Sequence, residues 1–66
     1  MIKRKANVFF NEKIIVHIVL NNTSFYNGLL FKVTDDYLII HDRVEGRKQL
    51  FLFDIKNIEE FRGVGE

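Results

Sequence analysis

The chain has 66 residues, 47% of them apolar, with seven Phe and a formal net charge of +1 at pH 7. This length makes one domain near the lower limit of what folds alone, and so small a net charge does not by itself indicate nucleic-acid binding. The absence of cysteine excludes a disulfide framework and a thiolate metal site. The apolar content is high for so small a body, and we expect the excess to lie in contacts between subunits.

Reactive groups are sparse along the chain. His17 and His41 lie in different predicted strands, and no His/Asp/Glu cluster has metal-ligand spacing. We therefore expect no metal, no cofactor and no enzyme activity. No apolar run approaches the roughly 20 residues of a membrane span, and too few apolar residues follow the basic start to make a signal peptide. We expect a cytoplasmic protein with a single domain over residues 1–66 and no membrane partner.

Residues 3–11, KRKANVFFN, contain no proline or glycine and place Ala6, Phe9 and Phe10 at helical spacing. They predict one short N-terminal helix whose basic turn faces water and whose Phe side faces the body. Such a short helix depends on tertiary support.

From Lys13 the period changes to that of β-strands. Residues 14–20, IIVHIVL, are β-branched and nearly continuous, which is typical of a strand buried on both faces or at a subunit contact. Asn21-Asn22-Thr23 has turn chemistry. Residues 24–33 predict a second strand with a sharp bend at Gly28, because glycine tolerates the backbone angles and close approach of a bend.

Three further strands are predicted at short intervals, over residues 37–44, 47–53 and 58–61. Turns are predicted at 34–36, 45–46 and 54–57, and a loose tail at 62–66. A helix followed by five antiparallel strands, the second strongly bent, predicts an all-β fold. Its sheet should form a small SH3-like barrel over residues 13–61. The absence of proline fits strands whose amide groups are all engaged, including edge strands paired between subunits.

Several segments together resemble the Sm/LSm family, which includes bacterial Hfq and the archaeal Sm-like proteins. Phe9-Phe10-Asn11-Glu12-Lys13 followed by IIVHIVL is similar to the family's helix end and first strand. Leu20 to Gly28 resembles its L-x-N-G-x-x-apolar-x-G run, with Thr23 where a glycine is usual. Gly28-Leu29-Leu30, then Val33 and the pair Ile39-Ile40, match the pattern of the first Sm motif. Leu52-Phe53 with Ile58 and Phe61 resembles the second. Each element is generic alone; the joint spacing carries the resemblance, with KOW-type and other SH3-like barrels as alternatives.

The resemblance implies a homo-oligomeric ring of six or seven subunits, in which the fourth strand of one subunit pairs with the fifth of the next. It also implies a non-catalytic RNA chaperone or scaffold acting on single-stranded, uridine-rich RNA. In the family such RNA binds near the pore, through the loops after the second and fourth strands. The matching residues here are Asp36, Tyr37, Lys56 and Asn57.

Each of these pore-loop residues has a plainer interpretation as well. Tyr37 would stack on a base, or it packs against a neighbour at the end of the barrel. Lys56 and Asn57 would hold a phosphate and a base edge, or they belong to an ordinary polar turn. The two carboxylates of Asp35 and Asp36 are expected to form a solvated turn rather than an acid–base pair.

Two departures from the family pattern fall in the same loops. The loop Thr34-Asp35-Asp36-Tyr37 lacks the Asn that usually follows shortly after the Asp, and Asp54-Ile55 stands where Arg-Gly is usual. An acid in place of the cation that clamps the base should repel phosphate. The sequence therefore also fits a protein–protein assembly module of the same fold without an RNA pocket, or an accessory subunit of a larger ribonucleoprotein.

Basic residues suggest a second route to phosphate that is independent of the pore loops. They lie at the N-terminus and around the third hairpin, and together they would make a basic rim: Lys3, Arg4, Lys5, Arg43, Arg47 and Lys48. The alternative for both groups is ordinary solvated surface.

Overall fold

One helix and five strands make up the computed structural model, which describes residues 1–62. The helix is α1 (Ile2–Asn11), and a short 3-10 turn, η1 (Leu52–Asp54), lies between the last two strands. The strands are β1 (Val16–Leu20), β2 (Phe25–Val33), β3 (Tyr37–Asp42), β4 (Gly46–Phe51) and β5 (Ile55–Glu60). Most of the predicted tail, residues 63–66, lies outside the described residues.

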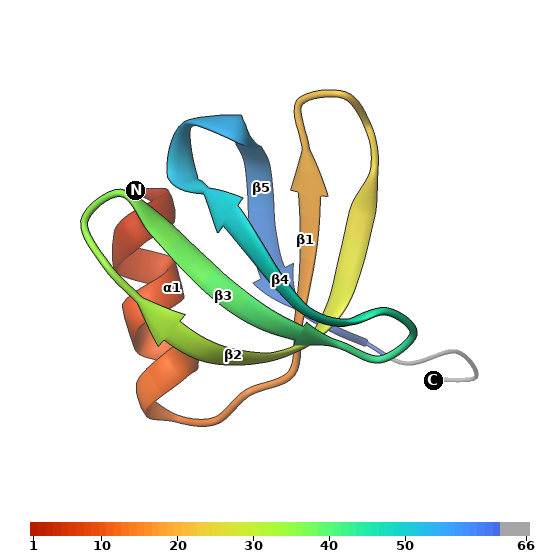
Figure 1. Cartoon of the computed structure of the whole chain (residues 1–66). Helices are drawn as coiled ribbons and strands as arrows, with labels where there is room; N and C mark the ends of the chain where they lie inside the picture. The colour runs from red at the N-terminus through yellow and green to blue at the C-terminus, as the bar shows by residue number, and fades with distance from the viewer. Residues whose placement is uncertain (63–66) are drawn as a thin grey trace.

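The strands form one antiparallel sheet in the order β4-β3-β2-β1-β5. Figure 1 shows the long strand β2 curving across the molecule, so that the sheet wraps around its own interior. In the described part of the chain β4 and β5 do not pair with each other, and both are edge strands. This confirms the predicted fold class, an all-β small barrel with an N-terminal helix, which is an architecture of the Sm-like type.

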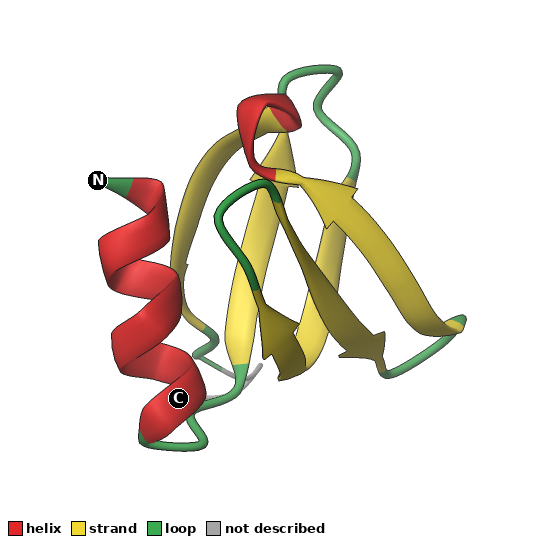
Figure 2. Cartoon of the chain, turned by 60° about the vertical axis from the view of Figure 1, so that its left-hand side comes forward, coloured by secondary structure: helices red, strands yellow, loops and turns green. Residues whose placement is uncertain are grey.

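Helix α1 lies against one side of the barrel, as Figure 2 shows, and contacts β2 and β5. Ala6 is completely buried, and Phe9 packs against the core from a partly buried position. Phe10, predicted to face the body as well, is 37% exposed. With 3.6 residues per turn, adjacent residues point about 100° apart, so Phe9 and Phe10 do not share a narrow buried stripe.

The core is a single cluster inside the curved sheet. Its buried members come from the helix and all five strands: Ala6, Val16, Ile18, Leu30, Leu38, Ile40, Leu50, Ile55 and Ile58. Of the two predictions for residues 14–20, burial on both faces is wrong for the single chain, and a subunit contact stays a prediction. Val16 and Ile18 point inward, while Ile15 precedes β1 and is 42% exposed. A one-layer sheet buries only one face of each strand.

The sheet contains two irregularities that change strand positions. Opposite the step from Val19 to Leu20, β5 advances by two residues, so Lys56 is the extra residue of a bulge. The predicted turn at 54–57 is therefore wrong beyond Asp54, because β5 already begins at Ile55. In β2, Phe31 is the extra residue opposite Ile39 and Ile40.

The hairpin between β3 and β4 also differs from its predicted position. Strand β3 ends at Asp42, the turn occupies residues 43–45, and Gly46 begins β4 with φ +84°. The Asp42 carboxylate accepts hydrogen bonds from the backbone N–H groups of Val44 and Glu45, at 2.9 and 2.8 Å, and of Asn27, at 3.0 Å. This carboxylate ends the strand early because it draws the following amides into a turn.

Gly28 is the predicted bend, and the structure assigns it a second requirement. It pairs with Asp42 of β3 and with Val16 of β1, in the curved part of β2. A Cβ atom placed on Gly28 would lie 1.9 Å from the backbone oxygen of His41. Glycine is needed here because the backbone of β3 approaches too closely for any side chain.

Candidate binding surfaces

The outer face of the sheet carries a shallow groove of about 720 Å³. Its walls come from β2, β3 and the segments that flank β1 and β5: Ile15, Gly28, Leu29, Leu30, Phe31, His41, Asp42, Arg43 and Phe61. Leu29 and His41 are directly opposite each other, and Arg47 of β4 continues the same row across the sheet. We call this surface the groove.

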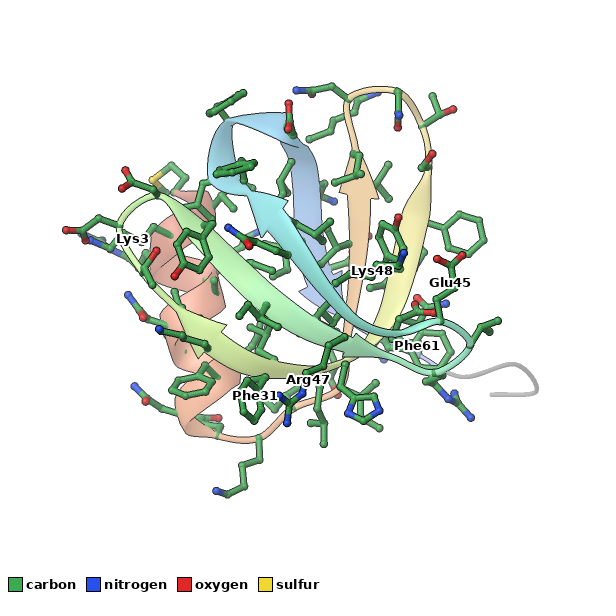
Figure 3. All side chains as sticks on the ribbon, in the orientation of Figure 1. Lys3, Phe31, Glu45, Arg47, Lys48 and Phe61 are labelled. Atoms are coloured by element: carbon green, nitrogen blue, oxygen red, sulfur yellow. The ribbon has the colours of Figure 1, made fainter. Side chains whose placement is uncertain are left out.

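Two arginine side chains lie on phenylalanine rings along the groove. The guanidinium carbon of Arg47 is 3.9 Å from the ring centre of Phe31, and that of Arg43 is 5.6 Å from the ring centre of Phe61. Figure 3 shows Arg47 beside Phe31, with Phe61 farther along the molecule. Phe31 is available for this contact because it is the bulge residue of β2, and a bulge re-aims its side chain.

Counted together with Arg47, which lies beside it on Phe31, the groove has a positive balance of charge. Asp42 is the one acid among the described residues that line it, and its carboxylate is held by backbone amides with only 7% of the residue exposed. Lys48 of β4 is engaged by Glu45 at 2.9 Å, and this hydrogen bond raises the pKa of Lys48. Arg43 and Arg47 therefore supply the cations that a ligand in the groove would meet.

A second surface lies at the opposite end of β3, where three aromatic residues gather. The rings of Phe51 and Phe53 are stacked, with centres 5.9 Å apart and planes at 19°. Tyr37 meets Phe51 edge to face at 6.3 Å, and the two residues are cross-strand partners. Phe53 is 79% exposed and Phe51 is 44% exposed. We call Tyr37, Phe51 and Phe53 the aromatic end.

Three exposed acids adjoin the aromatic end in the sequence: Asp35 and Asp36 before Tyr37, and Asp54 after Phe53. Asp35 forms an ion pair with Lys3 of α1, and this hydrogen bond together with the charge of Lys3 lowers the pKa of the Asp35 carboxyl. Backbone hydrogen bonds hold the two loops together, from Leu52 N–H to the Asp36 carbonyl at 2.9 Å.

The structure separates the four predicted pore-loop residues. Asp36 and Tyr37 lie at the aromatic end. Asp36 is in the turn between β2 and β3, and Tyr37 is the first residue of β3. Lys56 and Asn57 lie within β5 instead of a loop, where Asn57 is paired with Val19 and its side chain reaches Glu59 at 3.4 Å. The loop position that they were predicted to occupy belongs to Phe53 and Asp54.

The six predicted rim residues fall into two groups on separate elements. Lys3, Arg4 and Lys5 lie in the first turns of α1, where Lys3 pairs with Asp35 and Lys5 reaches the Ile58 carbonyl at 3.5 Å. Arg43, Arg47 and Lys48 lie on the β3–β4 hairpin. In Figure 3, Lys3 lies well away from Arg47. Of the six, only Arg43 lines the groove, and Arg47 lies beside it on the ring of Phe31.

The two histidines lie on different strands, His17 in β1 and His41 in β3. His17 is half-buried, and its Nδ1 lies within hydrogen-bond distance of Asn27 Oδ1. His41 is exposed while its neighbour Asp42 is buried, because adjacent residues of β3 face opposite sides of the sheet. Within residues 1–62 no three His, Cys, Asp or Glu side chains are grouped so as to hold a metal ion. No helix in this range is long and apolar enough to cross a membrane.

Comparison with known proteins adds no assignment: no protein-family model and no curated protein sequence matches the chain. The surfaces themselves therefore carry the functional argument. Sequence reasoning missed the roles of Phe31, Phe51 and Phe53. For Phe51 and Phe53 the available signal was the continuous apolar run Leu50-Phe51-Leu52-Phe53. A strand with one buried face must leave either its Leu or its Phe side chains on the outer face.

Proposed function

We propose that this protein is a non-catalytic, Sm-like RNA-binding protein that holds single-stranded RNA in the groove. The observation that carries the proposal is the stacking of Arg47 on the exposed ring of Phe31. Single-stranded RNA is bound by proteins that combine cations for the backbone with flat groups on which unstacked bases lie. Arg43 and Phe61 repeat the same combination at the other end of the groove.

The proposal moves the RNA contacts away from the predicted pore loops. The aromatic end offers rings but has Asp36 and Asp54 beside them, and its nearby cation, Lys3, is already paired. Phosphate is repelled by such an arrangement. The groove has the opposite balance, with Arg43 in its lining, Arg47 beside it on Phe31, and one carboxylate that is turned inward. RNA should therefore bind along β2 and β3.

We further propose that the chain assembles with copies of itself into a six- or seven-membered ring through its two edge strands. The support is that β4 and β5 both end the sheet in the described residues. Among residues 1–62, ten large apolar side chains are also 37–90% exposed. An unpaired edge is a template for another strand, and a contact between two different edges closes into a ring when the rotation permits.

The RNA proposal is tested by measuring the affinity of a short, labelled uridine-rich oligonucleotide for the wild type and for Arg47→Ala. Losing both the charge and the stacking surface should weaken binding about tenfold, since one stacked base contributes roughly 1–3 kcal/mol. Arg4→Ala is the matched control, because it removes the same charge from α1 and should change the affinity little. Equal losses in the two variants would contradict a defined site in the groove.

Salt dependence provides an independent check. If Arg43 and Arg47 neutralise two phosphates of a single strand, a tenfold rise in salt should weaken binding roughly 25-fold. An adenine-rich oligonucleotide of equal length reports whether uridine is preferred.

The second candidate function is that of an assembly module that does not bind RNA, and it is favoured by the exposed apolar side chains. It predicts oligomers in native mass spectrometry that take up no RNA at any salt concentration.

A further inference from the structure

We propose that the aromatic end is a docking site for an arginine side chain on an extended segment of a partner protein. This site is separate from the groove, and the proposal stands whether or not the groove binds RNA. The placement of the rings, the charge around them and the planar shape of the ligand all favour a guanidinium group.

The rings of the aromatic end are held in place while remaining open to solvent. The Asn21 side chain donates to the Phe53 carbonyl at 3.0 Å, and Asn21 N–H donates to the Asp54 carbonyl at 2.8 Å. The bond from Leu52 N–H to the Asp36 carbonyl fixes the other side of η1. Phe53 nevertheless keeps 79% of its surface exposed. A large ring on an anchored backbone is suited to binding, because little ordering remains to be done when a ligand arrives.

The charge around the rings selects a cation. The faces of aromatic rings carry partial negative charge and attract cations within about 6 Å. Asp36 and Asp54 are exposed and adjacent in sequence to Tyr37 and Phe53, and they add full negative charges. Asp35 and Lys3 offset each other as an ion pair. Lys56, exposed on β5, is the cation nearest in sequence to Asp54 and leaves the local balance negative.

Among cations, the guanidinium group fits best. It is planar, so it stacks on a ring, and its edge N–H groups can donate to a carboxylate at the same time. The chain already uses this pairing twice, with Arg47 on Phe31 and Arg43 on Phe61. An arginine stacked on the open face of Phe53, with its N–H groups toward Asp54 or Asp36, would repeat the contact between proteins.

The test is an NMR titration of the full chain with a short peptide that contains two arginines separated by glycines. We expect shifts at the ring and amide signals of Tyr37, Phe51 and Phe53. A peptide with citrulline in place of arginine keeps the shape without the charge, and it should bind about threefold to tenfold more weakly. Shifts confined to other surfaces, or equal binding of the citrulline peptide, would overturn the proposal.

Matched variants distinguish binding at the aromatic end from non-specific electrostatic or hydrophobic binding elsewhere on the surface. Phe53→Ala and Asp54→Asn should each weaken the arginine peptide about threefold or more. The controls are Phe25→Ala, another exposed phenylalanine, and Glu60→Gln, another exposed acid; both should leave the affinity unchanged. Losses as large in the controls would overturn the site. Shifts at the aromatic end caused by a uridine-rich oligonucleotide but not by the peptide would assign it to RNA instead.

Discussion

At the scale of single residues, Thr23 occupies a backbone conformation that its side chain disfavours. Its φ is +72°, in the turn between β1 and β2. A left-handed conformation costs an L-residue roughly 1–2 kcal/mol, and β-branched residues adopt it least readily.

We expect Thr23→Gly to stabilise the fold by about 0.5–1 kcal/mol. Removing the backbone strain stabilises the folded state. The added conformational entropy of glycine in the unfolded chain destabilises the protein by up to about 1 kcal/mol, which is the smaller of the two contributions. Denaturant unfolding of the two proteins measures the difference. Ser24→Gly is the control, because Ser24 has no positive φ and its replacement should be mildly destabilising. A less stable Thr23→Gly would argue against the strained turn.

Asp42 shows how one buried side chain can organise three segments. Burial alone would raise the pKa of its carboxyl, but three backbone N–H donors, from Glu45, Val44 and Asn27, together with the charge of Lys48, lower it below the ordinary value. Asp42→Asn keeps the size but replaces an acceptor with an amide donor. We expect it to cost about 1–3 kcal/mol at pH 7, because backbone donors lose their partner.

The same residue makes stability depend on pH in a definite direction. The folded pKa of Asp42 is depressed, so its stabilisation is present above the unfolded value of about 4 and is lost as pH falls through the folded pKa. The stability gap between wild type and Asp42→Asn should therefore narrow in acid. Urea unfolding of both proteins at pH 7 and at about pH 3 measures this difference in the free energy of unfolding. A stability gap of the same size at both pH values would contradict this role of the Asp42 carboxylate.

At the scale of elements, the number of strands and their order along the chain could be predicted from alternation and turn residues. The start of β5 could not. Ile55 and Ile58 are both buried, although residues three apart face opposite sides of a regular strand. The bulge at Lys56 reconciles them, because one extra residue restores the inward face. A bulge leaves no reliable mark in one sequence, so the polar stretch around it resembled a turn.

Close packing between β2 and β3 leads to a prediction about two glycines. Gly28→Ala would place a Cβ 1.9 Å from the His41 oxygen, a backbone atom that can move only if the strands separate. We expect a loss of about 3 kcal/mol or more, or failure to fold. Gly46→Ala is the matched control, since a Cβ there meets nothing within 4 Å and only its φ of +84° is unfavourable. It should cost about 1–2 kcal/mol. Thermal unfolding compares the two, and equal losses would contradict the close approach.

At the scale of the whole molecule, the directions of edge amides decide what can pair with them. Phe61 N–H donates to the Ile15 carbonyl, and strand amides alternate in direction. Glu60 N–H of β5 therefore points away from β1, toward the open edge. On β4, Leu52 N–H donates to the Asp36 carbonyl at the end of the ladder with β3, so Gln49 N–H likewise points outward.

We expect Glu60→Pro and Gln49→Pro each to abolish self-association while leaving the fold intact, because each removes only an outward N–H. Native mass spectrometry measures the assembly, and circular dichroism confirms folding. A head-to-tail ring uses both edges in every contact, so either variant should break it. Dissociation by only one variant would indicate a two-fold contact of one edge with itself. Glu59→Pro, which removes an N–H directed at β1, should instead destabilise the monomer.

The candidate binding surfaces could be predicted only in part from the sequence, because they depend on contacts between strands that are distant in the chain. Arg43 and Arg47 could be picked out as cations, and Tyr37 as a candidate for stacking on a base. Their partners could not, because the Arg47–Phe31 contact spans β3 and depends on the bulge in β2. Phe53 was assigned to a strand, and its exposure follows from the 3-10 turn that replaces the end of that strand.

The arginines stacked along the groove have a consequence for the speed and precision of recognition. A free arginine on a protein surface samples many rotamers, and immobilising it on a ligand costs roughly 0.5–1.5 kcal/mol. With Arg47 lying 3.9 Å from the Phe31 ring before any ligand arrives, much of that motion is already restricted. The Arg47 side chain is ordered once, when the protein folds. Each ligand that binds afterwards therefore finds the edge and the outer face of the guanidinium group already in position. Such a surface favours ligands of matching spacing over ligands that merely carry opposite charge.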